Sequence, residues 1–265
     1  MKLKVPRFSR KTLGIPYAVF LLFFVIIPML VIVFYAFTDR ENHFTFANFG
    51  KFFSDPTKLS TIVYSLVIAL VTTVCCLLIA YPVAYILARS KMKKKFVLLM
   101  LFVMPMWINF VLRVNAIREL FNWIGLLGQA NYFNTVFGMV YDFLPFMILP
   151  LYTTIQKIDG SLYEASADLG GNGFTTFTRV TLPLSMPGIM SGVTMVFLPS
   201  MTNYVVSDML GNSMVTIIGK FIYEYFGSNW HMGSMVALVL LVVVFVSTWL
   251  SGGFKSEDNV RGTNL

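Results

Sequence analysis

Three acidic side chains stand out because each lies within or beside a long apolar stretch. Asp142 sits inside the run VFGMVYDFLPFMILP, while Asp208 and Glu119 each follow an apolar segment closely. A charged group at membrane depth is costly, so such residues usually face a cavity or pair with a partner. These carboxylates could therefore bind a cationic ligand through charge-assisted hydrogen bonds.

Aromatic side chains accompany the acids. Trp107, Tyr141 and Tyr204 lie near them in the sequence, and aromatic faces attract organic cations. The competing interpretation is that Trp107 and Tyr204 belong to the aromatic belt at the membrane–water interface. We take Trp107, Asp142, Tyr204 and Asp208 as the candidate substrate pathway.

The acids also have ordinary interpretations, which remain open on the sequence alone. Asp142 could form a structural ion pair with Arg113 or Arg118. Asp208 could cap the element that follows it or stay in solvent. Glu119 directly follows Arg118 and could lie at the interface.

A polar segment, SLYEASADLGGNGFTTFTRVTLPLSMP, interrupts the apolar sequence over residues 161–187. Ser161 and Glu164 form an S-x-x-E pattern, which predicts a capping box and a short helix beginning near Leu162. The residues Leu162, Ala165 and Leu169 share one face of that helix. Gly170 and Gly171 are expected to supply left-handed conformations that end it.

A second short amphipathic helix is predicted after the Asn172-Gly173 turn signal. Phe174, Phe177 and Val180 mark its apolar face, and Pro183 is expected to stop it. The segment should therefore form a helical hairpin outside the bilayer.

This segment resembles the signature loop of ABC importer permeases, which reads E-A-A, three residues, G, nine residues, I-x-L-P. Glu164, Ala165, Gly170, Leu182 and Pro183 agree in identity, Ser166 replaces the second alanine, and Val180 replaces the isoleucine. The resemblance implies a coupling helix that sits in a groove of a cytoplasmic ATPase subunit. It assigns coupling to Glu164, Ala165, Ser166, Leu169, Gly170, Leu182 and Pro183, although Glu164 could be only a helix cap.

The composition indicates a membrane protein. Of 265 residues, 57% are hydrophobic and 12% are charged, and the mean hydropathy is +0.75, outside the balance of soluble domains. A helix needs roughly 20 mostly apolar residues to cross a bilayer. Six stretches qualify, at about 15–37, 62–87, 96–114, 134–154, 187–206 and 235–251. We expect the fifth to kink at Pro199 or to end early near Tyr204.

The fold class expected is an all-α integral membrane protein with six transmembrane helices of the ABC importer permease type. Residues 1–14 form a basic cytoplasmic N-terminus, 15–251 the permease domain with its coupling loop at about 157–186, and 252–265 a polar cytoplasmic tail. With both termini inside, 14 of the 20 lysines and arginines lie on the cytoplasmic side. The positive-inside rule favours this orientation, and it places the Glu164 loop in the cytoplasm.

Catalysis and direct ATP binding have no support in the sequence. There is no G-x-x-x-x-G-K-[ST] loop, so ATP and Mg are expected to bind a partner ATPase subunit, and this chain needs no cofactor or metal. The net charge of +8 follows from topology, because no basic run is interleaved with aromatics as in nucleic-acid-binding proteins. Cys75 and Cys76 are adjacent in an apolar stretch and are interpreted as packing residues.

Three further stretches resemble the spermidine/putrescine branch of these permeases. They are MPMWINFVLRV, LPFMILPLYTTIQKID and LPSMTNYVVSDMLG. The resemblance implies polyamine import into the cytoplasm, with a homologous second permease subunit, two ATPase subunits and an extracytoplasmic polyamine-binding protein as partners. The alternatives are a permease of the same fold for another solute, such as an inorganic anion or ferric ion, and a self-contained channel or scaffold.

Overall fold

The computed structural model describes residues 10–212 and 214–250, and within them the regular structure is helical apart from a single β-bridge. The chain divides into two compact units, one of residues 1–56 with 221–242 and one of residues 57–220 with 243–265. The predicted N-terminal segment lies largely, and the predicted tail entirely, outside the described residues.

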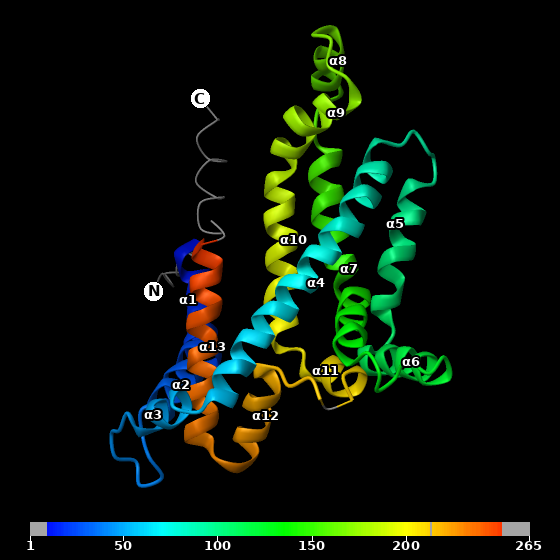
Figure 1. The fold of residues 1–265 in the computed structure, drawn as a ribbon. Helices are drawn as coiled ribbons and strands as arrows, with labels where there is room; N and C mark the ends of the chain where they lie inside the picture. The colour runs from blue at the N-terminus through cyan, green and yellow to red at the C-terminus, as the bar shows by residue number, and fades with distance from the viewer. Residues whose placement is uncertain (1–9, 213, 251–265) are drawn as a thin grey trace, which may run out of the picture. The chain divides into compact units, whose positions relative to one another are not determined.

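The first unit is built around the N-terminal apolar helix (Figure 1). That helix runs through Gly14–Ala36 and agrees with the predicted span at 15–37. A π-turn precedes Pro28 and widens the helix where the proline ring would otherwise meet a carbonyl of the preceding turn. The unit comprises α1 (Arg10–Leu21), η1 (Leu22–Ile26), α2 (Ile27–Ala36), α3 (Ala47–Phe53), most of α12 (Ile218–Ser228) and the start of α13 (Trp230–Leu250).

The second unit contains the remaining long helices and the polar loop. Its elements are α4 (Pro56–Arg89), α5 (Lys95–Val103), η2 (Met104–Trp107), α6 (Phe110–Trp123), α7 (Asn131–Gln156), α8 (Gly160–Asp168), α9 (Gly173–Thr176), η3 (Phe177–Thr181), α10 (Leu182–Thr202) and α11 (Tyr204–Leu210). In Figure 1, α8 and α9 lie beyond the ends of α7 and α10, which they connect.

The lengths and compositions of the described helices permit four continuous membrane spans, or five if the bent pair of α5 and α6 counts as one. The four are Gly14–Ala36, Pro56–Arg89, Asn131–Gln156 and Gly173–Thr202, and residues Trp230–Val246 of α13 form a further, shorter apolar helix. These helices agree with an all-α membrane fold. The count of six crossings stays a prediction.

The prediction of one continuous third span at 96–114 was wrong. The chain breaks after Trp107, and α6 leaves at 94° to the helix before it. Two residues cause the break: Ile108 is extended, and Asn109 caps α6 by accepting the N–H of Val111 at 2.9 Å. Asparagine is a strong helix N-cap, and here its local signal prevails over the apolar pattern that predicted continuity.

The fifth span begins earlier than predicted because Pro183 does not stop the preceding helix. The helical segment is continuous over Gly173–Thr202, with Pro183 in the first turn of α10. The π-turn η3 directly precedes it and relieves the clash that a proline makes with the turn before it. Pro199 lies inside α10. The helix ends at Thr202, which agrees with the expectation that the fifth span ends early near Tyr204.

Helices α7 and α10 lie side by side in the second unit (Figure 1). Their close approach depends on Gly188 and Gly192, four residues apart on α10. A Cβ on Gly188 would lie 2.8 Å from the carbonyl oxygen of Pro150, and one on Gly192 would lie 2.5 Å from the sulfur of Met147. Small residues at this spacing let helix backbones approach closely in membranes.

We predict that Gly188→Ala destabilises the protein, because the added methyl would overlap a carbonyl that cannot move away without shifting α7. Overpacking of this kind costs about 1–3 kcal/mol, measured as a lower midpoint of thermal unfolding of the purified protein in detergent. Gly50→Ala is the matched control, because a Cβ there meets no atom within 4 Å. Equal midpoints for the two variants would contradict this account of the α7–α10 contact.

Candidate functional site

The start of α8 is fixed by Asp159 and not by the predicted capping box of Ser161 and Glu164. The Asp159 carboxylate accepts the backbone N–H of Ser161 at 3.0 Å, and α8 begins at Gly160. The same hydrogen bond lowers the pKa of Asp159, because it stabilises the charged carboxylate. Asp159 prevails since aspartate is among the best N-caps. Glu164 is consequently exposed on the helix surface.

The end of α8 depends on both glycines, for different reasons. Gly170 has φ +78°, which a side chain would strain, and its N–H donates to the carbonyl of Ala167 at 2.9 Å. Gly171 is not left-handed, so that prediction was wrong. It donates to the carbonyl of Ser166 at 2.8 Å, and a Cβ there would lie 2.7 Å from that oxygen.

A second turn closes the loop back onto α8. Asn172 caps α9 by accepting the N–H of Thr175 at 2.8 Å. The hydroxyls of Ser166 and Thr176 lie 2.8 Å apart and join α8 to α9. The predicted helical hairpin is confirmed, and Ser166 holds its two arms together.

Several apolar side chains of this hairpin are exposed. Leu162, Ala165 and Leu169 are all exposed, and Leu169 is 90% exposed. Phe174 adds a further apolar side chain, 76% exposed. A contiguous exposed apolar patch rimmed by polar residues is typical of a protein interaction surface.

The opposite surface of the hairpin is attached to the membrane helices. The guanidinium of Arg89, at the end of α4, lies 3.5 Å from the ring centroid of Tyr163 on α8. Phe177 packs edge-on against Tyr81 of α4 with centroids 5.5 Å apart, and the Tyr81 hydroxyl lies 2.8 Å from that of Ser185 on α10. Sequence reasoning missed these anchors, because the pairs are far apart in the chain and share no motif.

The last two residues of the signature motif lie where the hairpin joins α10. Leu182 is half-buried and packs against the core of the unit. Pro183 is exposed in the first turn of α10. The motif residues are thus spread over one continuous helical segment and the hairpin before it.

Asp142 of the candidate substrate pathway is paired with Arg113 and not with Arg118. An oxygen of its carboxylate lies 2.6 Å from Arg113 Nη2, and both side chains are buried. The ring of Tyr141 lies 6.0 Å from the same guanidinium. The pair ties α6 to α7 and neutralises the charge of Asp142, so the structural alternative for this residue is realised.

Asp208 is also paired. It lies in α11 and accepts a hydrogen bond from Lys220 Nζ at 2.7 Å, so it does not lie in a loop. Tyr204 is four residues earlier on α11, which places the two side chains on one face of this short helix. Sequence reasoning missed Lys220, whose only signal was its place beyond the fifth span.

The remaining candidates lie on other elements. Trp107 ends η2 at the break in the third span and is 79% exposed. Glu119 is exposed on α6. Within the described residues, no cluster of three or more histidine, cysteine or acidic side chains could hold a metal ion.

Comparison with known proteins shows the family to which the chain belongs. Residues 80–254 match the family model described as "Binding-protein-dependent transport system inner membrane component". The spermidine/putrescine transport system permease protein PotB of Haemophilus influenzae is 35% identical over 92% of this chain and 93% of its own length. PotB of Escherichia coli is 33% identical over 84% of this chain and 90% of its own length.

A solved structure shares the fold. It is that of a bacterial alginate ABC transporter in complex with an alginate pentasaccharide-bound periplasmic protein, and one of its chains matches with a TM-score of 0.75 and 17% identity over 93% of both chains. The family match covers the α8–α9 hairpin and most of the spans described above. The chain belongs to the binding-protein-dependent transport system inner membrane components, the permease subunits of ABC importers.

Proposed function

We propose that this permease imports polyamines, with spermidine and putrescine as its substrates. The observation that carries the proposal is the 33–35% identity to PotB proteins along nearly the whole chain. The likeness to the alginate transporter supports the fold alone, because the identity there is 17%. An importer of this kind moves the substrate inward across a cell membrane that the chain spans several times, with both termini in the cytoplasm.

The chain would act as one subunit of a larger complex. An extracytoplasmic polyamine-binding protein delivers the substrate, a homologous second permease subunit completes the path, and two ATPase subunits bind ATP and Mg. The chain itself performs no catalysis in this scheme. It supplies a path across the membrane and a surface on which the ATPase acts.

The coupling role falls to the α8–α9 hairpin. Its exposed apolar face, with Leu162, Ala165 and Leu169, would sit against the ATPase. Movement of the ATPase would displace the hairpin as a unit, because the turn at Gly170 and the hydroxyl contact from Ser166 hold its arms together. Arg89 of α4 and the unbroken helix through η3 into α10 would pass the movement into the membrane.

The candidate substrate pathway contains Trp107, Asp142, Tyr204 and Asp208. In this structure the two acids already bind cationic side chains of the chain itself, namely Arg113 and Lys220. A substrate ammonium is the same chemical group as the Lys220 Nζ. It would therefore have to replace Lys220 at Asp208, and movement of the surrounding helices would have to free either acid.

The substrate is tested by uptake of radiolabelled spermidine and putrescine into proteoliposomes that contain the complete complex and its binding protein. We expect saturable uptake that requires ATP on the side of the membrane that carries the ATPase subunits. The two polyamines should compete with each other for uptake. If the binding protein stimulates ATPase activity but no polyamine is taken up, the assignment as an importer stands and the assignment of polyamines as its substrate is wrong.

The coupling role is tested by Glu164→Ala and by Leu169→Asp in the same assay. Both substitutions alter the exposed face of α8, so we expect ATP hydrolysis to continue while uptake falls by about tenfold or more, equivalent to at least ~1.4 kcal/mol of lost coupling. Glu224→Ala removes an exposed acid from α12 and is the matched control. Normal uptake by both hairpin variants would contradict the assignment.

A further inference from the structure

The loop between α4 and α5, residues 90–95, carries a concentration of positive charge, and we call it the lysine loop. Lys91, Lys93 and Lys94 are exposed in it, and Lys95 is the first residue of α5. Residues 56–118 contain no aspartate or glutamate. Within the described part of the chain, none of the four lysines forms an ion pair with an acid. The lysine loop therefore needs a negative partner from outside the described chain.

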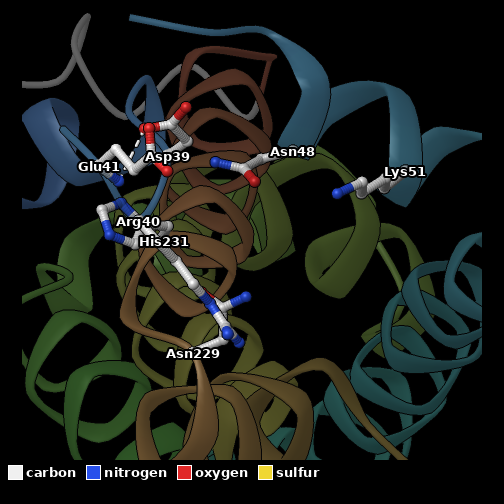
Figure 2. A pocket seen from close by; sticks show the side chains of 7 residues that line it. All are labelled: Asp39, Arg40, Glu41, Asn48, Lys51, Asn229 and His231. Atoms are coloured by element: carbon white, nitrogen blue, oxygen red, sulfur yellow. Dashed lines mark hydrogen bonds between the residues drawn. The ribbon is translucent and has the colours of Figure 1, made fainter. Parts of the chain in front are cut away.

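Basic side chains in the first unit have a different setting. Arg40 and Lys51 line a cavity of about 300 Å³ together with the acids Asp39 and Glu41, as Figure 2 shows. Positive and negative side chains therefore occur together in that cavity. The lysine loop has positive side chains alone.

Exposed apolar side chains flank the lysines on both sides. Ile86 is exposed in the last turn of α4, and Phe96 is 63% exposed in the first turn of α5. Met92 is an exposed apolar side chain inside the lysine loop itself. Apolar side chains on the surface of a membrane helix face hydrocarbon. The lysines between them therefore lie at the depth of the lipid headgroups, with their aliphatic stems along the boundary.

Hydrogen bonds hold the lysine loop in a compact turn. The Ser90 hydroxyl oxygen accepts the backbone N–H of Met92 at 3.1 Å, and the carbonyl of Met92 accepts the N–H of Lys95 at 3.4 Å. Lys93 and Lys94 lie between these two bonds, at the turn. A turn that is already formed presents its charges together, so a ligand pays less to order them.

The lysine loop lies beside the α8–α9 hairpin. Arg89, the residue directly before the loop, has its guanidinium 3.5 Å from the ring centroid of Tyr163 on α8. In Figure 1 the connection from α4 to α5 is at the same end of the second unit as α8. Both belong to one compact unit. A ligand on the lysine loop would therefore bind next to the hairpin.

An anionic phospholipid fits this surface better than a soluble anion, because it offers a negative headgroup to the lysines and acyl chains to the flanking apolar side chains. In the orientation that the positive-inside rule favours, the lysine loop faces the cytoplasmic leaflet, which is rich in anionic lipid.

We propose that the lysine loop is a binding site for anionic phospholipid headgroups. The bound phosphate offsets the repulsion among the lysines and Arg89, and so favours the turn in which Arg89 packs on Tyr163 of the hairpin. The lipid site stands on the described residues alone. Its effect on coupling rests on the proposed function.

The lipid site is tested by electron paramagnetic resonance of spin-labelled phosphatidylglycerol in phosphatidylcholine nanodiscs that contain the complete complex. We expect K93Q/K94Q to bind the labelled lipid about tenfold or more weakly than wild type, because each lysine at a membrane surface adds attraction. K93R/K94R keeps both charges and should stay within about threefold of wild type. R40Q/K51Q removes the same number of charges and is the matched control, which should also stay within about threefold.

Three results would overturn the lipid site. The first is equal binding of phosphatidylglycerol by wild type and K93Q/K94Q, with or without loss of the ATPase subunits. The second is an equal loss in R40Q/K51Q, because the effect would then follow net charge alone. The third is displacement of the lipid by inorganic phosphate at constant ionic strength, because the ligand would then be a soluble anion.

The effect on coupling is tested by polyamine uptake per ATP hydrolysed, in proteoliposomes with a rising content of phosphatidylglycerol. We expect this ratio to rise in wild type and to stay flat in K93Q/K94Q. An equal rise in both would overturn the link between the lipid and the hairpin. If wild type binds phosphatidylglycerol but shows no uptake at any lipid composition, the proposed function fails and the lipid site stands.

Discussion

The close packing of α7 against α10 is the constraint on which the rest of the second unit depends. Two glycines on α10 let its backbone approach Met147 and Pro150 of α7. Because the α8–α9 hairpin is the connection between these two helices, their spacing also sets the position of the hairpin. In a membrane, such packing replaces the hydrophobic effect as the force that holds helices together.

The hairpin is rigid for reasons that can be read from individual residues. Asp159 starts α8, Gly170 reverses the chain, and Ser166 holds the second arm. Its outer face stays apolar and open, while Arg89 and Phe177 tie its inner face to α4. A loop with one apolar face free and the other anchored is suited to receive a force from a partner and to pass it on without deforming.

Much of this could be predicted from the sequence. The apolar stretches gave most of the spans because hydrophobic length is a strong signal, and the motif around Glu164 located the hairpin. The predictions failed where two local sequence signals favoured different structures. Asp159 prevailed over Ser161 as the cap, Asn109 broke a span that composition alone made continuous, and a π-turn let the helix continue through Pro183.

The partners of Asp142 and Asp208 could not have been predicted with the same certainty. The bond from Arg113 to Asp142 was one of several options, and the bond from Lys220 to Asp208 joins two helices through a turn that has no sequence signature. Both acids are neutralised by the chain itself. In the proposed importer, a substrate cation could therefore not bind either carboxylate in the state described here until the helices move.

The most direct test of the account is photo-cross-linking from Leu169, the most exposed apolar residue of the hairpin. A photoreactive amino acid at position 169, in the complete complex, is predicted to cross-link to the ATPase subunit, and the cross-linked complex should no longer transport. The same amino acid at Trp123, which is also highly exposed but lies at the end of α6, should give no such product. Cross-linking to the ATPase from position 123 but not from 169, or full transport by the cross-linked complex, would contradict the central role of the hairpin.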